Sequence, residues 1–394
     1  MAIAKKINSF ISQSSFIRKM FEEGIRLKKE YGEAAVFDFS LGNPNVAPPE
    51  AFCDNLKEVS RACIPGKHGY MPNAGYWETR AGVAAQVNRE QGLTTLTAEE
   101  IVMTCGAGGA LNVILKTLLD PGDEVIAPSP FFVEYRFYVD NVGGELKMVP
   151  VKPDFSLDLE AIAQAITSRT KAVLINSPNN PTGKVYDFAT MTALAALLED
   201  KSRALSHEIY LISDEPYRDI VYDGALVPSV LAAYTNSLIA SSYSKSLSLP
   251  GERLGFVAVN QGITDHDAVM SGLTLCNRIL GFVNAPALMQ RAITGLSGVS
   301  VDVEMYRKKR DLLCNGLASA GYSVVKPQGA FYLFQPTPIP DDVSFADALR
   351  EERVLVVPGS GFFGPGHIRI AYCVDDATIA GSMEGFAKVL KKFR

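Results

Sequence analysis

ASSYSKSLSLPGERLGFVAV, residues 240–259, joins two apolar segments through a loop that carries a lysine. Leu238–Ala240 and Gly255–Val259 have the small and β-branched composition of buried strands. Lys245 lies among small hydroxyl residues just past the first segment, and Arg253 follows eight residues later. A lysine buried near other cations has a lowered pKa and can attack a carbonyl group, and an arginine can fork onto a phosphate. Taken alone, Lys245 is more often a solvated loop residue.

Short apolar runs alternate with helical patterns from about residue 100 to 260. Strands are predicted at Ile101–Thr104, Glu124–Ala127, Glu145–Val151, Ala172–Asn176, Tyr210–Ser213, Leu238–Ala240 and Gly255–Val259, and helices at roughly 109–119, 158–167 and 187–205. This alternation predicts an α/β fold in which a mostly parallel seven-stranded sheet is flanked by helices. Ligands of such sheets bind outside the carboxyl ends of the strands, so polar residues there are the candidates for chemistry.

After about residue 262 the pattern predicts a second, smaller α+β domain. A long helix is expected from about 297 to 320, strands near Tyr322–Val325, Ala330–Phe334, Val354–Val357 and Ile368–Cys373, and a closing helix towards Arg394. We expect residues 1–45 to form an N-terminal arm and part of this small domain, 46–290 the large domain, and 291–394 the rest of the small domain.

Composition narrows the class of protein. The chain has 394 residues, of which 47% are apolar, and a net charge of -5, so it can fill two domains and lacks the basic surface that binds nucleic acid. We expect no signal peptide and no membrane span, because no apolar run approaches the roughly 18 to 20 residues that a span needs. The four histidines and six cysteines are scattered, which argues against a metal site and favours reduced thiols in the cytoplasm.

Four further groups of residues follow predicted strands. They are Asp214 with Tyr217, Asn180 in an Asn- and Pro-rich turn, Gly106, Ala107 and Gly108 ahead of a helix, and the aromatic Phe132. A carboxylate at a buried strand end needs a partner, and one that faces a pyridine nitrogen keeps it protonated. Glycines at a helix N-terminus expose N–H groups that can cradle a phosphate. Each group has an ordinary alternative, namely a helix cap, a turn, a tight connection or a core aromatic. Five such features in one domain, each at a strand end, are hard to explain as unrelated loops.

The stretch from Ser242-Tyr243-Ser244-Lys245 to Gly251-Glu252-Arg253-Leu254-Gly255 resembles the lysine signature of the class I/II aminotransferases, the aspartate-aminotransferase-like branch of the fold-type-I pyridoxal-phosphate enzymes. The resemblance extends from Leu41-Gly42-Asn43-Pro44 to Ile368-Arg369-Ile370. It implies an enzyme that moves an amino group between an L-amino acid and a 2-oxo acid, with pyridoxal 5'-phosphate bound to Lys245 as a Schiff base.

The resemblance also implies a role for each candidate residue. Lys245 would shuttle a proton, Asp214 would pair with the nitrogen of the cofactor ring, and Tyr217 and Asn180 would bond its 3' oxygen, while Phe132 would stack on the ring. The phosphate of the cofactor would be held by Gly106, Ala107, Gly108, Ser242 and Arg253. Arg369, beside Gly42, would clamp the substrate α-carboxylate.

Tyr70 lies in a segment similar to one whose tyrosine reaches the phosphate of the neighbouring subunit, which implies a homodimer with shared sites. Gly108 stands where one aspartate-specific branch carries a lysine for the distal carboxylate. Arg278 offers another route to an aspartate or glutamate side chain, from the partner subunit. The alternative is that Arg278 is a helix-end residue facing solvent or the dimer interface.

Three other functions stay open at this stage. A β-lyase acting on cysteine S-conjugates would use the same lysine, aspartate and arginine. A nucleotide-binding dehydrogenase is disfavoured because Cys105–Gly109 lacks GxGxxG spacing. A regulator that kept this domain would need an added DNA-binding module and a basic surface, and we find neither.

Overall fold

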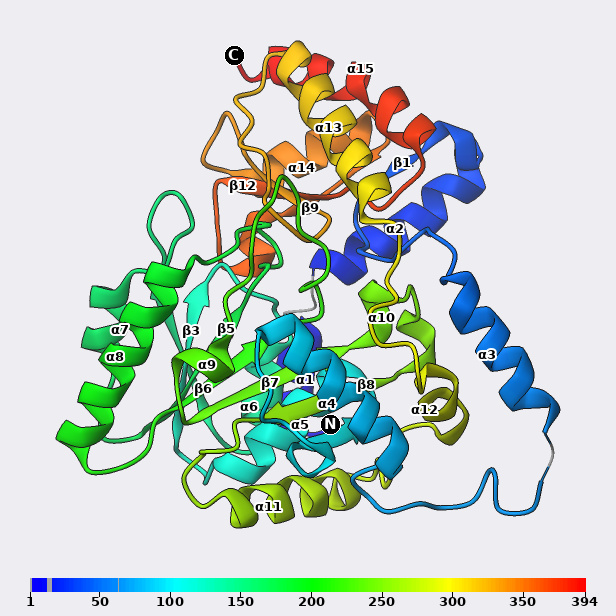
Figure 1. The fold of residues 1–394 in the computed structure, drawn as a ribbon. Coiled ribbons are helices and arrows are strands. Elements are labelled where there is room, and N and C mark those ends of the chain that lie inside the picture. Colours follow the sequence, from blue (N-terminus) through cyan, green and yellow to red (C-terminus); the bar gives the residue numbers. More distant parts are fainter. Residues whose placement is uncertain (1, 13–15, 63) are drawn as a thin grey trace.

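The computed structural model describes residues 2–12, 16–62 and 64–394 (Figure 1). Its centre is a seven-stranded sheet in the order β2-β8-β7-β6-β5-β3-β4. These strands are β2 (Ile101–Thr104), β3 (Glu124–Ser129), β4 (Glu145–Pro150), β5 (Thr170–Asn176), β6 (Tyr210–Asp214), β7 (Ser237–Ser242) and β8 (Gly255–Val259). β8 runs antiparallel to β2 and β7, and the other pairs are parallel. The predicted mostly parallel α/β sheet is confirmed.

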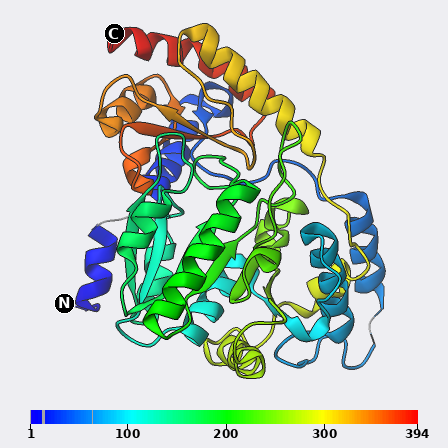
Figure 2. The same cartoon turned by 60° about the vertical axis from the view of Figure 1, so that its left-hand side comes forward.

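Helices cover both faces of this sheet (Figure 2). One face packs against α5 (Gly106–Leu118), α6 (Tyr135–Asn141) and α11 (His266–Ile279), and the other against α3 (Glu50–Arg61), α4 (Trp77–Gln91), α7 (Leu159–Ala165), α8 (Phe188–Leu205), α9 (Val230–Ala233) and α12 (Ala287–Ile293). Every residue of β2, β6 and β8 is accordingly buried, as expected for a sheet covered on both faces.

A second core lies above the sheet. It is built on β9 (Tyr332–Pro336), β11 (Val357–Pro358) and β12 (His367–Ala371), which pair antiparallel in the order β11-β12-β9. Around them lie α2 (Phe16–Tyr31), α13 (Val303–Ala320), α14 (Asp342–Glu351) and α15 (Asp376–Lys392), with α13 and α15 side by side at the top of Figure 1. β1 (Phe37–Asp38) pairs in parallel with β10 (Val354–Leu355), so segments from both parts of the chain meet here. The boundaries at 45/46 and 290/291 stay a prediction.

The predicted strand Tyr322–Val325 is wrong. These residues form no strand, and Val325 is 77% exposed. The Gln335 amide donates to the Ser323 carbonyl at 2.9 Å, so a side chain takes up a backbone group that a strand would pair with a neighbour. The long helix also begins later than expected, at Val303, because the Asp302 carboxylate caps the N–H of Glu304.

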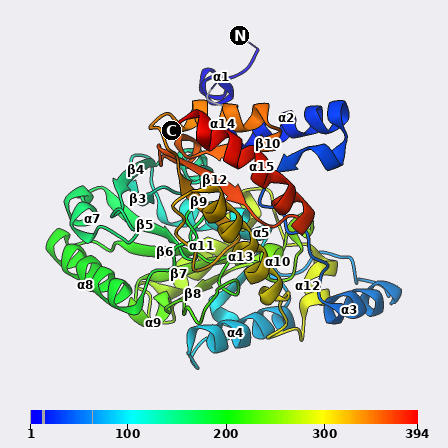
Figure 3. The same ribbon diagram turned by 90° about the horizontal axis from the view of Figure 1, so that it is seen from above.

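The remaining elements are short or peripheral. They are α1 (Lys5–Ser12), α10 (Tyr243–Ser246), and the 3₁₀ turns η1 (Glu33–Ala35), η2 (Ala98–Glu100), η3 (Pro250–Glu252) and η4 (Gly359–Phe362). Helix α1 lies at the edge of the molecule (Figure 3), where Phe10 contacts Phe137 and Lys6 pairs with Asp140. Within the described ranges, no helix combines the length and apolar character that crossing a bilayer requires.

Candidate active site

A cavity of about 260 Å³ opens where β5, β6 and β7 end and α5 begins. One water occupies roughly 30 Å³, so the cavity admits an organic molecule. Its wall contains most of the predicted residues: Gly42, Ala107, Gly108, Phe132, Asn180, Asp214, Tyr217, Ser242, Lys245, Arg253 and Arg369. The topology thus brings strand-end residues from distant parts of the chain together, as expected for this sheet class.

Lys245 lies on the one-turn helix α10, and its amine donates to the Gly42 carbonyl at 2.9 Å. Burial lowers the pKa of Lys245 to about 8, with the Cys373 thiol acting in the opposite direction and the Arg369 and Arg253 charges adding to the decrease. The neutral fraction of this amine near physiological pH is therefore far larger than in an exposed lysine, although the protonated form still predominates. A neutral amine is the form that attacks a carbonyl carbon.

Asp214 is the last residue of β6, and only one of its carboxylate oxygens is occupied. The Tyr135 hydroxyl donates to Oδ2 at 2.5 Å, whereas Oδ1 is buried and has no hydrogen-bond partner among the described residues. Burial raises the pKa of Asp214 to about 7, the Tyr135 bond acts to lower it, and Glu215 adds to the rise. A cationic N–H donor placed at Oδ1 would lower this pKa and keep the carboxylate charged.

Tyr217 and Asn180 supply neutral polar groups to the cavity wall. The Tyr217 hydroxyl lies 2.8 Å from the Tyr332 hydroxyl, and burial holds the pKa of Tyr217 well above its usual range, so the phenol stays a donor. The Asn180 Oδ1 accepts a bond from Arg369 at 3.2 Å. The ring of Phe132 packs edge to face with that of Tyr135, the partner of Asp214, at 5.7 Å between centroids.

The first turn of α5 forms one end of the cavity. Gly106 has a φ of 72°, and a Cβ on it would lie 2.6 Å from Arg253 Nη2, so glycine lets the guanidinium approach the helix N-terminus. Ala107 and Gly108 line the cavity beside Ser242. Unpaired N–H groups of a first helical turn, next to an arginine, make a site for a phosphate or another anion.

Arg369 on β12 lies at the other end. Its Nη2 donates to the Ser40 carbonyl at 2.6 Å and its Nη1 to Asn180, but its buried Nε has no acceptor in the part of the chain that the structure describes. Burial acts to lower the pKa of Arg369. A buried guanidinium with an unused N–H favours an anionic ligand, and a carboxylate matches its planar geometry.

Known proteins resemble this chain over nearly its whole length. Residues 34–385 match the family model for aminotransferase class I and II. The chain belongs to this family. The aspartate/prephenate aminotransferase of Thermus thermophilus is 37% identical over 89% of this chain and 90% of its own. A solved aminotransferase from Eubacterium rectale has a TM-score of 0.96 and 40% identity over 100% of both chains, and the Thermus thermophilus aspartate aminotransferase with maleate has 0.87 and 32% over 99% and 100%.

The protein is thus an aminotransferase, and its family implies pyridoxal phosphate as the cofactor. The residues fit that group. Its ring nitrogen suits the unpartnered Oδ1 of Asp214, its aldehyde suits the amine of Lys245, and its phosphate suits the first turn of α5 beside Arg253. No cluster of His, Cys, Asp and Glu side chains that could hold a metal ion occurs in residues 2–12, 16–62 and 64–394.

Three predicted residues of the aminotransferase do not line this cavity in their own chain: Gly106, which underlies Arg253 in the first turn of α5, Tyr70 and Arg278. Tyr70 is 93% exposed, and Arg278 lies on the exposed end of α11, where it lines a separate surface hollow with Arg80 and Thr274. The contribution of Tyr70 and Arg278 to a partner's site stays a prediction.

Three tyrosines escaped the sequence analysis: Tyr138 and Tyr332, which line the cavity, and Tyr135, which bonds to Asp214 of its wall. Tyr135 contacts Asp214 but does not follow a strand end, and Tyr332 lies inside an apolar run that predicts only a strand. Tyr138 lies one helical turn beyond Tyr135, and this spacing in α6 was the available signal. Ser244 also lines the cavity, within the signature stretch itself.

Proposed function

We propose that this aminotransferase holds pyridoxal phosphate on Lys245 and moves an amino group between an L-amino acid and a 2-oxo acid whose α-carboxylate binds Arg369. One observation carries the proposal. The amine of Lys245, the Oδ1 of Asp214 and the Nε of Arg369 belong to one cavity wall, and the last two have unused bonding capacity among the described residues. Buried polar atoms are nearly always satisfied, so these atoms call for a ligand.

Each end of the cavity has a separate task in this proposal. Asp214 would hold the ring nitrogen protonated, Tyr217 and Asn180 would bond the ring oxygen, and the first turn of α5 with Ser242 and Arg253 would hold the phosphate. Phe132 packs against the ring. When bound, the cofactor supplies an electron sink that acidifies the Cα–H bond of an amino acid.

Lys245 also moves the proton. In the loaded enzyme its Nζ would accept the proton of the substrate Cα and hold it for return, and a pKa of about 8 suits an amine that must both accept and release a proton near neutral pH. Arg369 fixes the α-carboxylate by a charge-assisted pair, so the Cα–H bond is presented to Lys245 in one orientation.

The substrate side chain is proposed to be that of aspartate or glutamate. Support comes from relatives that are aspartate aminotransferases, although one relative, from Thermococcus litoralis, is an aromatic-amino-acid aminotransferase. The cations among the described residues of the cavity wall are Lys245, Arg253 and Arg369, and each has a task already. A distal carboxylate therefore needs a cation from elsewhere, and Arg278 of a second subunit is our candidate.

A substrate panel tests the reaction. The purified protein, loaded with pyridoxal phosphate, is mixed with aspartate, glutamate, alanine or phenylalanine, and the absorbance of the bound cofactor is followed before and after a 2-oxo acid is added. We expect aspartate or glutamate to change the absorbance and the 2-oxo acid to restore it. Release of pyruvate and ammonia from a cysteine S-conjugate without any 2-oxo acid would favour the β-lyase instead.

A mixing experiment tests the shared site. Arg278→Ala is expected to raise KM for aspartate much more than KM for alanine, and Lys245→Ala to be inactive. In a mixed dimer one site pairs an intact Lys245 with the partner's intact arginine, so random mixing should restore about a quarter of the wild-type aspartate activity by subunit counting. No recovery on mixing, or an equal KM increase for all substrates, would remove Arg278 from the proposal.

A further inference from the structure

Tyr332 lies between two of the groups that the proposed function uses. It is 3% exposed, it lines the cavity, and its hydroxyl is 2.8 Å from that of Tyr217. Its ring lies under the guanidinium of Arg369, with 4.6 Å from the ring centroid to the guanidinium carbon. The sequence alone assigns this tyrosine to an ordinary buried strand.

We propose that Tyr332 is a positioning residue that links the α-carboxylate clamp, Arg369, to the donor that bonds the cofactor oxygen, Tyr217. The inference rests on the proposed function and deepens it. One side chain would then adjust both substrate binding and the acidity of the bound cofactor.

The strand register explains the first contact. Tyr332 pairs with Ala371 across β9 and β12, and Arg369 lies two residues from Ala371 on the same face of the sheet. This diagonal relation brings a long side chain over an aromatic ring. The ring of Phe362 also contacts Arg369, at 4.5 Å from its centroid to the guanidinium carbon, so two aromatic rings restrain the guanidinium through cation–π contacts. The orientation of the guanidinium plane determines the direction from which a carboxylate can accept a bond from the unpaired Nε of Arg369.

The hydroxyl pair explains the second contact. Each phenol has one hydrogen, so at 2.8 Å one of the two hydroxyls donates to the other. When Tyr332 is the donor, the hydrogen of Tyr217 is left for an oxygen in the cavity. A buried chain of two O–H groups also polarises the terminal donor and strengthens its bond to an anionic oxygen. Tyr332 therefore sets how strongly Tyr217 can stabilise that oxygen.

Close packing holds Tyr332 in this position. A Cβ on Gly42 would lie 1.9 Å from the Tyr332 hydroxyl oxygen, so only glycine fits at that point of the segment whose carbonyls bond Lys245 and Arg369. The ring of Tyr332 also packs against Phe331 at 5.1 Å between centroids. The hydroxyl thus lies at a fixed point between three elements.

Tyr306 provides a matched control. It is also fully buried and packs against Phe331 at 5.4 Å, but its hydroxyl has no hydrogen-bond partner among the described residues and the residue does not line the cavity. Tyr306→Phe removes the same atom from the same core without touching the proposed link.

The test compares Tyr332→Phe, Tyr332→Leu and Tyr306→Phe by two readouts: the pH midpoint of the bound-cofactor absorbance, and KM and kcat for the best amino donor. Tyr332→Phe should raise the pH midpoint by about one unit, because the bond to the cofactor oxygen weakens, and should leave KM within about twofold. Tyr332→Leu should raise KM by about tenfold as well, because Arg369 loses one ring. Tyr306→Phe should change neither quantity.

A double variant keeps the link testable if Tyr332→Leu folds poorly. Tyr217→Phe combined with Tyr332→Phe should shift the midpoint no further than Tyr217→Phe alone, because Tyr332 acts through Tyr217. Additive shifts, or a Tyr332→Phe midpoint equal to that of wild type, would overturn the inference. Failure of the proposed function is a separate result, since the wild-type protein would then show no cofactor absorbance at all.

Discussion

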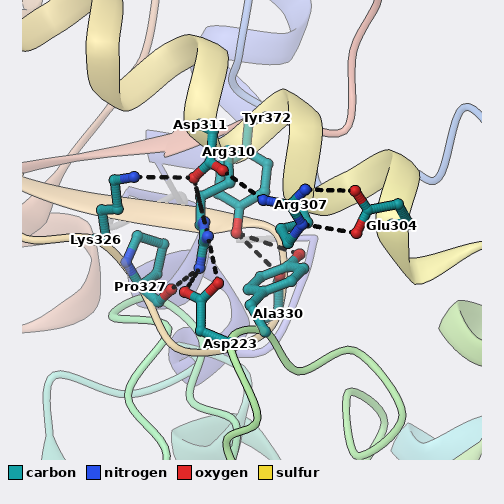
Figure 4. Close-up of polar contacts among 10 residues, drawn as sticks. Asp223, Glu304, Arg307, Arg310, Asp311, Lys326, Pro327, Ala330 and Tyr372 are labelled. Carbon is teal, nitrogen blue, oxygen red and sulfur yellow. Dashed lines mark hydrogen bonds and ion pairs between the residues drawn. The ribbon is translucent and has the colours of Figure 1, made fainter.

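Arg310 and Arg369 are both buried arginines, and they differ in what their nitrogens contact. Arg310, on α13, is 1% exposed on its side chain, and every guanidinium nitrogen has a partner. Its Nη1 and Nη2 fork onto Asp223 at 2.6 and 3.1 Å, and its Nε donates to Asp311 at 3.0 Å (Figure 4). Arg369 leaves its Nε without an acceptor among the described residues, in a cavity where Asp214 leaves an oxygen equally unpaired.

This difference indicates that Arg310 stabilises the fold, whereas Arg369 serves to bind a ligand. Asp223 lies on the loop beyond Tyr217, and its bonds with Arg310 connect that loop to α13. Because every guanidinium nitrogen of Arg310 has a partner within the protein, this arginine needs no ligand. In the cavity, Asp214 Oδ1 and Arg369 Nε have no hydrogen-bond partner among the described residues, and a cationic N–H and a carboxylate of bound ligands would supply those partners. A buried polar group without a partner costs stability, and such costs are retained where function requires them.

The largest expected effect comes from Asp214→Asn. The amide keeps the bond from Tyr135 but cannot hold a positive ring nitrogen, so kcat/KM should fall by about 10³-fold. Steady-state kinetics of the cofactor-loaded variant measure the loss. Asp223→Asn makes the same change in the satisfied region and should leave kcat/KM within about twofold. Similar losses in both variants would contradict the comparison.

Arg369→Lys should raise KM for the amino donor by about 100-fold with a smaller change in kcat, because an ammonium group cannot form the bidentate pair. The matched change Arg310→Lys should leave KM near the wild-type value. We would abandon the carboxylate role if kcat fell while KM stayed constant.

The free energy of unfolding should depend more on Arg310 than on Arg369, which is the opposite of the order expected for KM. Arg310→Met removes charge-assisted bonds to Asp223 and Asp311 and should lower the free energy of unfolding by about 3 kcal/mol, measured by urea denaturation of the cofactor-free protein. Arg369→Met removes a buried charge that is only partly satisfied and should cost less than about 1 kcal/mol. A larger loss of stability in Arg369→Met than in Arg310→Met would show that Arg369, and not Arg310, is the arginine that stabilises the fold.

The stability of the cofactor-free protein should also depend on pH. Burial raises the pKa of Asp214 from 3.8 to about 7, so the folded state binds the extra proton and stability falls as pH rises between these values. Burial lowers the pKa of Lys245 from 10.5 to about 8, so the unfolded state binds the extra proton and stability rises with pH between 8 and 10.5. Melting curves across pH should lose the first slope in Asp214→Asn and the second in Lys245→Met. Unchanged slopes would show that other groups dominate.

Much of the sheet follows from local sequence. β2 and β8 were predicted to the residue because each is an uninterrupted apolar run bounded by turn residues. Tyr322–Val325 has a similar local pattern, yet its Ser323 carbonyl accepts a bond from the Gln335 side chain on β9, and no local signal reveals that.

The sequence predicts those site residues that lie at or just after the end of a strand, such as Lys245 and Asp214. Contacts between distant segments stayed hidden: Tyr135 lies 79 residues from Asp214, and Tyr332 lies 115 residues from Tyr217. Both tyrosines look like core residues, because the sequence shows where an aromatic is buried but not which hydroxyl it meets.

The central claim is that one lysine beside Asp214 holds pyridoxal phosphate. Its most direct test is to load the protein with pyridoxal phosphate, reduce it with borohydride, digest it and locate the modified peptide by mass spectrometry. We expect one stable modification, on Lys245, that is absent from Lys245→Ala. A modification that maps to another lysine, or a protein that remains unmodified and colourless after loading, would contradict it.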